Sequence, residues 1–268
     1  MKHIGAIPKV VFIAMVLIFL LSPIVVIIGA SFNPGSLVIF PPTGFSLKWY
    51  PQILMHHDLI YGMEISFIIA LVVIPISLLL GLFFGYFVVK TNRKYEVILS
   101  TYSLSPVYIP QIVFGIAALQ FVYLVFSSSG FLQLLIAHII ITVPFAIQIL
   151  VSGLRQIDPQ LEEAAFNLGE SRLGVFRRVI LPLLKPSIIA AITYIFILSF
   201  DNVAVSLFLS TPLLQPFPVV FYESIIQSLI NPTLAAFSTL LVILGAVILT
   251  LILKTVGLKS LAGMERTT

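Results

Sequence analysis

The sequence predicts an all-α membrane protein with six transmembrane helices, and three observations support this fold class. Apolar residues make up 60% of the 268 residues, charged residues make up only 9%, and the mean hydropathy is +1.17. A soluble globular domain carries about 25% charged residues, so this composition indicates a lipid environment. Six apolar stretches are long enough to cross a bilayer, with polar or proline-rich segments between them.

The expected spans follow one another along the whole chain. They cover residues 9–30, 59–89, 97–126, 131–154, 187–209 and 233–256. Gly81 and Gly85 form a G-x-x-x-G pair, which is typical of close packing between transmembrane helices. Pro106 and Pro110 interrupt the third span, and such irregular backbone is tolerated where it lines a cavity or packs on protein. No linker or soluble segment is long enough to be a second domain, so residues 1–268 are expected to form one transmembrane domain.

The basic residues predict the orientation of these spans. All fourteen lysines and arginines except Lys48 fall on one side of the six spans. Positive charge accumulates in cytoplasmic loops, so both termini and the long polar loop 156–186 are expected in the cytoplasm. This placement also explains the net charge of +4 without any affinity for nucleic acid. The first span is too long for a signal-peptide core and has no clear cleavage site, so it is expected to be retained.

The loop 156–186 is the longest polar interval and carries its own helix signals. Asp158 followed by Pro159 is typical of an N-cap and a first-turn proline. Glu162 and Glu163 then fall in the first turn, where the helix dipole favours negative charge. A helix is therefore expected to begin at the start of this loop.

The second part of the loop contains signals for an end and a restart. Gly169 is the expected C-cap, and Ser171 can begin a second short helix that ends before Pro182. A short helix is not stable alone in water, so the pair is expected to pack on another surface through a small apolar face. That face consists of Leu161, Ala165 and Leu168. The alternative is an amphipathic hairpin on the membrane, with its arginines on lipid phosphates.

The same loop matches a family pattern. The pattern is E-A-A, three residues, Gly, nine residues, Ile, one residue and Leu-Pro. This sequence keeps that spacing with Glu163-Ala164-Ala165, Gly169, Val179 and Leu181-Pro182, and Val179 takes the place of Ile. On these residues the sequence resembles the permease subunits of type I, binding-protein-dependent ABC importers. The resemblance implies the type I ABC importer transmembrane-domain fold and makes this loop a coupling helix that docks on an ATPase subunit. The ATPase-coupling residues that it implies are Glu162, Glu163, Ala164, Ala165, Gly169, Leu181 and Pro182.

Sequence signals for catalysis are weak. The chain contains neither G-x-x-x-x-G-K-[ST] nor G-x-G-x-x-G, so any ATP energy must come from a partner. It has no cysteine for a thiolate or a zinc site, and no metal site is expected. His138 with a serine could suggest hydrolysis, but without G-x-S-x-G an interior, hydrogen-bonded histidine is the expectation. The chain is therefore expected to be no enzyme, with no catalytic residue and no cofactor of its own; ATP and Mg²⁺ would be bound by the partner ATPase.

Asp201 is the most informative polar residue within a predicted span. An ionisable group inside a span costs about 2.5–3.5 kcal/mol on insertion scales unless it is paired or hydrated. With Ser199 and Asn202 nearby, Asp201 is expected to face the bundle interior or a water-filled path. The alternative is a structural hydrogen bond or ion pair with a neighbouring helix. Tyr108 and Gln111 in the interrupted third span are further candidates for the substrate path.

Two further segments resemble one branch of the family. The first, residues 45–50, reads FSLKWY, and the second, residues 199–202, reads SFDN and is followed by Pro218 and Tyr222. Both resemble the C-type subunit of the spermidine/putrescine-type branch. This resemblance implies a polyamine substrate and alternating access in the bacterial inner membrane. It also implies a second permease subunit in a heterodimer, an ATPase dimer and an extracytoplasmic solute-binding protein. Because related permeases share parts of the pattern, opines, phosphonates and ferric ion are alternative solutes. An ATPase-independent secondary carrier or channel is the alternative from another class.

Overall fold

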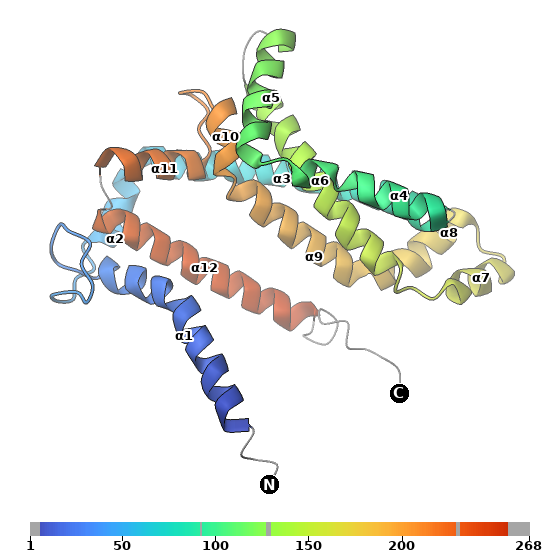
Figure 1. The fold of residues 1–268 in the computed structure, drawn as a ribbon, viewed down its shortest axis with the longest axis horizontal. Helices are drawn as coiled ribbons and strands as arrows, with labels where there is room; N and C mark the ends of the chain where they lie inside the picture. Colours follow the sequence, from blue (N-terminus) through green and yellow to red (C-terminus); the bar gives the residue numbers. More distant parts are fainter. Residues whose placement is uncertain (1–5, 92, 127–129, 229–230, 257–268) are drawn as a thin grey trace. The chain divides into compact units, whose positions relative to one another are not determined.

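The computed structural model describes residues 6–91, 93–126, 130–228 and 231–256, and the regular elements in these ranges are helices (Figure 1). The chain divides into two compact units. Of the described residues, those in 6–58 and 221–252 form the first, and those in 59–220 and 253–256 form the second. The first unit contains α1 (Ala6–Ser31), α2 (Trp49–Gln52), η1 (Ile53–Met55), the later part of α11 (Phe217–Ser228) and most of α12 (Pro232–Val256).

The second unit contains the elements on which the functional residues lie. In chain order these are α3 (His57–Lys90), α4 (Arg93–Ser103), η2 (Ser105–Tyr108), α5 (Gln111–Phe126), α6 (Phe131–Leu154), α7 (Pro159–Asn167), α8 (Arg172–Val175), the π-helical segment η3 (Phe176–Ile180), α9 (Leu181–Phe200) and α10 (Val203–Leu209). Within this unit α6 packs along α9, and α5 packs along α10. The helices α7 and α8 lie beyond one end of α6 and α9 (Figure 1).

In the first unit, Asn33 organises the segment between α1 and α2. Its side-chain Nδ2 donates to the carbonyl oxygen of Leu37 at 2.8 Å, and its Oδ1 accepts from the hydroxyl of Thr43 at 2.9 Å. The backbone carbonyl of Asn33 accepts from Nε1 of Trp49 at 2.7 Å. These bonds fold the segment that precedes α2 into a compact loop.

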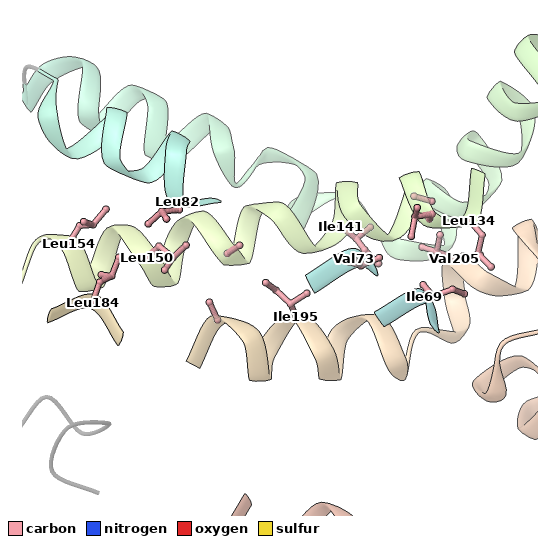
Figure 2. Close-up of a cluster of buried hydrophobic side chains, with 14 of the residues drawn as sticks. Ile69, Val73, Leu82, Leu134, Ile141, Leu150, Leu154, Leu184, Ile195 and Val205 are labelled. Atoms are coloured by element: carbon pink, nitrogen blue, oxygen red, sulfur yellow. The ribbon is translucent and has the colours of Figure 1, made fainter. Parts of the chain in front are cut away.

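The buried core of the second unit lies where α3, α6, α9 and α10 meet (Figure 2). Its members include the residues labelled in Figure 2: Ile69, Val73, Leu82, Leu134, Ile141, Leu150, Leu154, Leu184, Ile195 and Val205. Lipid tails are as apolar as these side chains, so close packing and interhelical hydrogen bonds hold such helices together. A Cβ at Gly81 would lie 2.8 Å from the Cβ of Ala146, and one at Gly85 would lie 3.3 Å from Cγ2 of Val151. The predicted use of this glycine pair in close helix packing is confirmed.

Six apolar helices correspond in order to the six predicted spans. Four of the described helices are long and apolar enough to cross a membrane: Lys9–Ser31, His57–Lys90, Phe131–Leu154 and Arg172–Phe200. Two described apolar helices are shorter: Gln111–Phe126 and Pro232–Ile248. The number of membrane crossings and the sidedness of the termini therefore stay predictions.

The interruption of the third predicted span, residues 97–126, at Pro106 and Pro110 is confirmed. The segment is divided into α4, η2 and α5, with the break around Pro106 and Pro110. Proline has no N–H to donate and biases the preceding residue away from the α conformation. Ile109, which precedes Pro110, has an extended backbone with φ −82° and ψ 124°. A helix can therefore restart only at Gln111.

The predicted fifth span over residues 187–209 differs from the structure. Its helix ends at Phe200, and α10 begins at Val203 after a turn at Asp201 and Asn202. At its other end, the expectation that the helix started by Ser171 ends before Pro182 is wrong. That helix continues through η3 into α9, giving one apolar helix from Arg172 to Phe200. The π-helical register of η3 accommodates the proline at the start of α9, which cannot donate an ordinary helical hydrogen bond.

Candidate functional site

The helix α7 begins as its sequence predicts. Asp158 is the N-cap, with an extended backbone, and its Oδ1 accepts a hydrogen bond from the backbone N–H of Gln160 at 2.9 Å. Pro159 occupies the first helical position, where its missing N–H costs nothing. Glu162 lies in the first turn. The predicted start of this helix is confirmed.

The end of α7 forms a complete glycine C-cap. Gly169 has φ +86°, in the left-handed region. Its N–H donates to the carbonyl of Phe166 at 2.9 Å, and the N–H of Glu170 donates to the carbonyl of Ala165 at 3.1 Å. This pair of bonds defines a Schellman motif, so the predicted C-cap is confirmed. A Cβ at Gly169 would meet no atom within 4 Å, so within this chain the requirement for glycine is conformational.

The restart after Gly169 is also fixed locally. The Oγ of Ser171 accepts from the backbone N–H of Gly174 at 3.1 Å and caps α8. The carboxylate of Glu170 forms an ion pair with Arg178 in η3. These contacts hold the turn between α7 and the long helix that follows it.

Two sides of α7 have different environments. Ala165 is only 9% exposed and packs in the same core cluster as Val175 and Ile180. Leu161 and Leu168 are exposed, the latter by 86%, so of the predicted apolar face only Ala165 packs within this chain, and packing of the two leucines on another surface stays a prediction. Leu168 directly precedes Gly169, and its backbone has already left the helical conformation.

The outward face of α7 consists of the exposed residues Leu161, Glu163, Ala164 and Leu168. Glu162 points to the other side, where its Oε1 lies 2.6 Å from Nζ of Lys90 at the end of α3. At the start of α9, Leu181 is partly buried and Pro182 is exposed. The structure thus separates the predicted coupling residues into an outward set and an inward set.

The second candidate region is a buried polar cluster around His138 on α6. Its Nδ1 lies 3.0 Å from the Oγ of Ser199 on α9, and its Nε2 lies 3.0 Å from the Oγ of Ser206 on α10. The Oγ1 of Thr142 bonds both the carbonyl of His138 and the Oγ of Ser77 on α3, each at 2.8 Å. His138 is 1% exposed, so the expectation of an interior, hydrogen-bonded histidine is confirmed. Its ring bridges the two sides of the break in the fifth predicted span.

The breaks in the third and fifth predicted spans meet. Asn202 caps α10 by accepting from the N–H of Val205 at 2.9 Å, and its Nδ2 donates to the Oε1 of Gln111 at 3.1 Å. Gln111 is the first residue of α5, which follows the other break. Asp201 lies in the turn before Asn202, with an exposed side chain that makes no hydrogen bond or ion pair with a described residue. Tyr108 in η2 is 77% exposed. Of the predicted path residues, the structure therefore joins Asn202 to Gln111 directly and leaves Asp201 beside them.

Two contacts in these regions could not be found from the sequence. Lys90 and Glu162 are 72 residues apart, and His138 and Ser206 are 68 residues apart. Any chain contains many side chains of opposite charge or complementary hydrogen-bonding capacity. Without the fold, the sequence does not show which of them form pairs. Among the described residues, no group of three or more histidine, aspartate or glutamate side chains is placed to hold a metal ion.

Comparison with known proteins identifies similar membrane proteins over most of the chain. The sequence profile of the family described as "Binding-protein-dependent transport system inner membrane component" matches residues 77–259. The spermidine/putrescine transport system permease protein PotC of Escherichia coli (strain K12) is 29% identical over 244 residues, which cover 91% of this chain and 92% of that protein. The putrescine transport system permease protein PotI of the same strain is 28% identical over 246 residues, covering 89% and 86%.

A more distant relative and one solved structure are also similar to this chain. The molybdate/tungstate transport system permease protein WtpB of Methanocaldococcus jannaschii is 23% identical over 222 residues, covering 80% of this chain and 82% of that protein. A solved structure of a bacterial ABC transporter involved in the import of the acidic polysaccharide alginate superposes with a TM-score of 0.67. It is 16% identical, and the superposition covers 94% of this chain and 96% of that one. At that identity the superposition shows a shared fold.

Proposed function

Because this chain belongs to the family of binding-protein-dependent transport system inner membrane components, it is a permease subunit of an ABC importer, and we propose that its substrate is a polyamine such as spermidine or putrescine. The family membership excludes the alternative of an ATPase-independent carrier or channel. It also gives the location, since such a subunit is a multi-pass protein of the bacterial inner membrane.

The similarity to two polyamine permeases carries the substrate proposal. Both cover about nine-tenths of this chain, whereas the molybdate/tungstate permease is less similar and covers less of it. The segments 45–50 and 199–202 add to this support, since they resemble the same branch. Other small solutes, including opines, phosphonates and ferric ion, are the alternatives that an uptake measurement must exclude.

In the proposed assembly this chain forms half of the translocation path. A second permease subunit completes a heterodimer, an extracytoplasmic solute-binding protein delivers the solute, and an ATPase dimer binds ATP and Mg²⁺. The outward face of α7 is the proposed docking surface for the ATPase. Two features support this role: the face is exposed, and the caps at Asp158 and Gly169 fix the helix that presents it.

Six membrane crossings with both termini in the cytoplasm complete the proposed topology. Six apolar helices and the one-sided distribution of lysine and arginine support it. With this orientation, the loop 156–186 lies on the side where ATP is available.

Asp201 is the proposed counter-ion on the translocation path. A polyamine carries several positive charges, and in a region of low dielectric such charges need negative or strongly polar partners. Asp201 has an exposed carboxylate at a helix break, with the amides of Asn202 and Gln111 beside it. Tyr108 is exposed on η2 near the break in the third predicted span, whereas Ser199 supports the turn through its bond to His138.

Uptake into proteoliposomes tests the substrate proposal. The complete transporter, with ATP enclosed, is supplied with its binding protein and with radiolabelled putrescine, spermidine or molybdate. We expect ATP-dependent uptake of at least one amine, which excess unlabelled polyamine abolishes. Uptake of molybdate without uptake of either amine would refute the polyamine proposal and leave the family assignment intact.

A further inference from the structure

The last turn of α3 contacts the loop 156–186 at two points. Lys90, the final residue of α3, places its Nζ 2.6 Å from Oε1 of Glu162 on α7. One turn earlier, the ring of Tyr86 packs edge-on against Phe176 of η3, with centroids 5.5 Å apart and planes at 80°. The Nζ of Lys90 also lies 5.7 Å from the centroid of the Tyr86 ring. The end of α3 therefore contacts both halves of the loop.

This ion pair differs from an ordinary surface pair in its placement. The side chain of Glu162 is only 13% exposed, and that of Lys90 is 41% exposed. Lys90 stands at the C-terminal end of a 34-residue helix and Glu162 stands in the first turn of α7, so each charge complements the dipole of its own helix. Exposed ion pairs between flexible side chains contribute little, but this one joins two helix ends.

The contact borders an open hollow of about 830 Å³ between α3, α7 and α8. Its other lining residues include Phe166 and Arg172. Because the hollow lies beside α7, its contacts with the rest of the second unit on this side include the ion pair of Glu162 and the buried side chain of Ala165. The outward face of α7 takes no part in either contact.

We propose that Lys90 is a positioning residue that ties α7 to α3, so that a movement of the docked loop displaces α3 together with α9. The loop is joined covalently to α9 through η3, but to α3 it is joined only through side chains. Without the ion pair, the ATPase can still dock on the outward face, but α7 loses its direct contact with α3. Its movement then reaches α3 less completely, through η3 and the contact of Phe176 with Tyr86. This inference rests on the proposed docking of the ATPase to that face.

Substitutions at Lys90 in the complete transporter test the inference. Lys90→Met keeps the length of the side chain and removes its charge, whereas Lys90→Arg keeps the charge. The matched control is Lys185→Met, which changes an exposed lysine of α9 that forms no ion pair with a described residue. We expect Lys90→Met to co-purify the ATPase at the wild-type level but to lower the number of putrescine molecules transported per ATP at least fivefold. Lys90→Arg and Lys185→Met are expected to stay within twofold of wild type.

A charge exchange and a distance measurement separate positioning from mere stability. The double variant Lys90→Glu with Glu162→Lys restores the pair with reversed sign, so it is expected to transport better than either single variant. Spin labels at Phe87 on α3 and Gln160 on α7, both exposed, report the distance between the helices with and without ATP and vanadate. We expect this distance to stay constant in the wild-type background and to change in Lys90→Met.

The possible results distinguish the inference from the function on which it rests. Wild-type coupling in Lys90→Met, an unchanged label distance in that variant, or no recovery in the exchanged pair would overturn the inference. Failure of the ATPase to co-purify with the wild-type permease would refute the proposed docking. The label measurement needs no transported substrate, so an error in the polyamine proposal does not affect it.

Discussion

Replacing Gly169 with alanine is expected to weaken binding of the ATPase. The expected cause is strain in the backbone of this chain, with no steric clash within it. The residue has φ +86°, a conformation that costs an ordinary L-residue about 1–2 kcal/mol. No atom lies within 4 Å of the added Cβ, so no steric contact within the chain increases or offsets this cost. Both C-cap bonds, to the carbonyls of Ala165 and Phe166, depend on this conformation.

The size of the effect follows from the shortness of α7. A helix of nine residues has little stability of its own, so a penalty of this size changes the population of its capped form. A penalty of 1–2 kcal/mol corresponds to a factor of about 5–30 in that population. If the ATPase binds only the capped form, its apparent dissociation constant rises by up to the same factor.

The measurement is a titration of the ATPase against the permease pair in nanodiscs, with uptake measured in parallel. Gly169→Asn is the informative comparison, because asparagine tolerates the left-handed region better than alanine does. Gly245→Ala is the neutral control, since a Cβ there also meets nothing within 4 Å and the residue is helical. We expect Gly169→Asn to bind more tightly than Gly169→Ala. Wild-type affinity in Gly169→Ala, or equal losses in both variants, would refute the conformational argument, and equal losses would point to crowding by the partner instead.

Three further predictions concern topology, charge and the buried cluster. Ser171 is exposed, and the chain has no cysteine of its own, so a single cysteine at this position can be labelled specifically. It should react with an impermeant thiol reagent only after the membrane is permeabilised. Labelling of intact cells from outside would contradict the proposed orientation. Asp201→Asn keeps the shape and removes the charge, so polyamine uptake should fall while the assembled complex retains its ATPase activity; normal uptake would exclude a counter-ion role. His138→Leu leaves the hydroxyls of Ser199 and Ser206 without their shared partner, and each lost hydrogen bond costs about 1 kcal/mol. The variant should therefore lower the melting temperature of the complex in detergent. An unchanged melting temperature would show that the cluster does not stabilise the fold.

The sequence by itself determined the features that depend on neighbouring residues. The N-cap at Asp158, the C-cap at Gly169 and the restart at Ser171 were all predictable, because each depends on the conformational preference of one residue and on hydrogen bonds within a few positions. The apolar stretches were equally clear, since length and composition decide whether a helix can cross a bilayer.

Local signals predicted one of the two interrupted spans and missed the other. Pro106 and Pro110 predicted the interruption within residues 97–126, because a proline acts on its own backbone and on the residue before it. At Asp201 the charge suggested a functional position, and nothing in the local pattern predicted that the helix would end there. The cap that Asn202 provides for the N–H of Val205 is local, but Asn202 also bonds the distant Gln111, which a local pattern does not contain.

Only the tertiary structure decided which polar residues act together. Glu162 had the same local signal as Glu163, yet one carboxylate pairs with Lys90 and the other lies on the outward face of α7. His138 likewise obtained its partners from α9 and α10. These pairings depend on how the helices cross, and crossing is set by close contacts such as that of Gly81 with Ala146. A contact between residues far apart in the chain does not depend on the conformational preference of either residue. It can therefore be identified only from the packed arrangement of the helices.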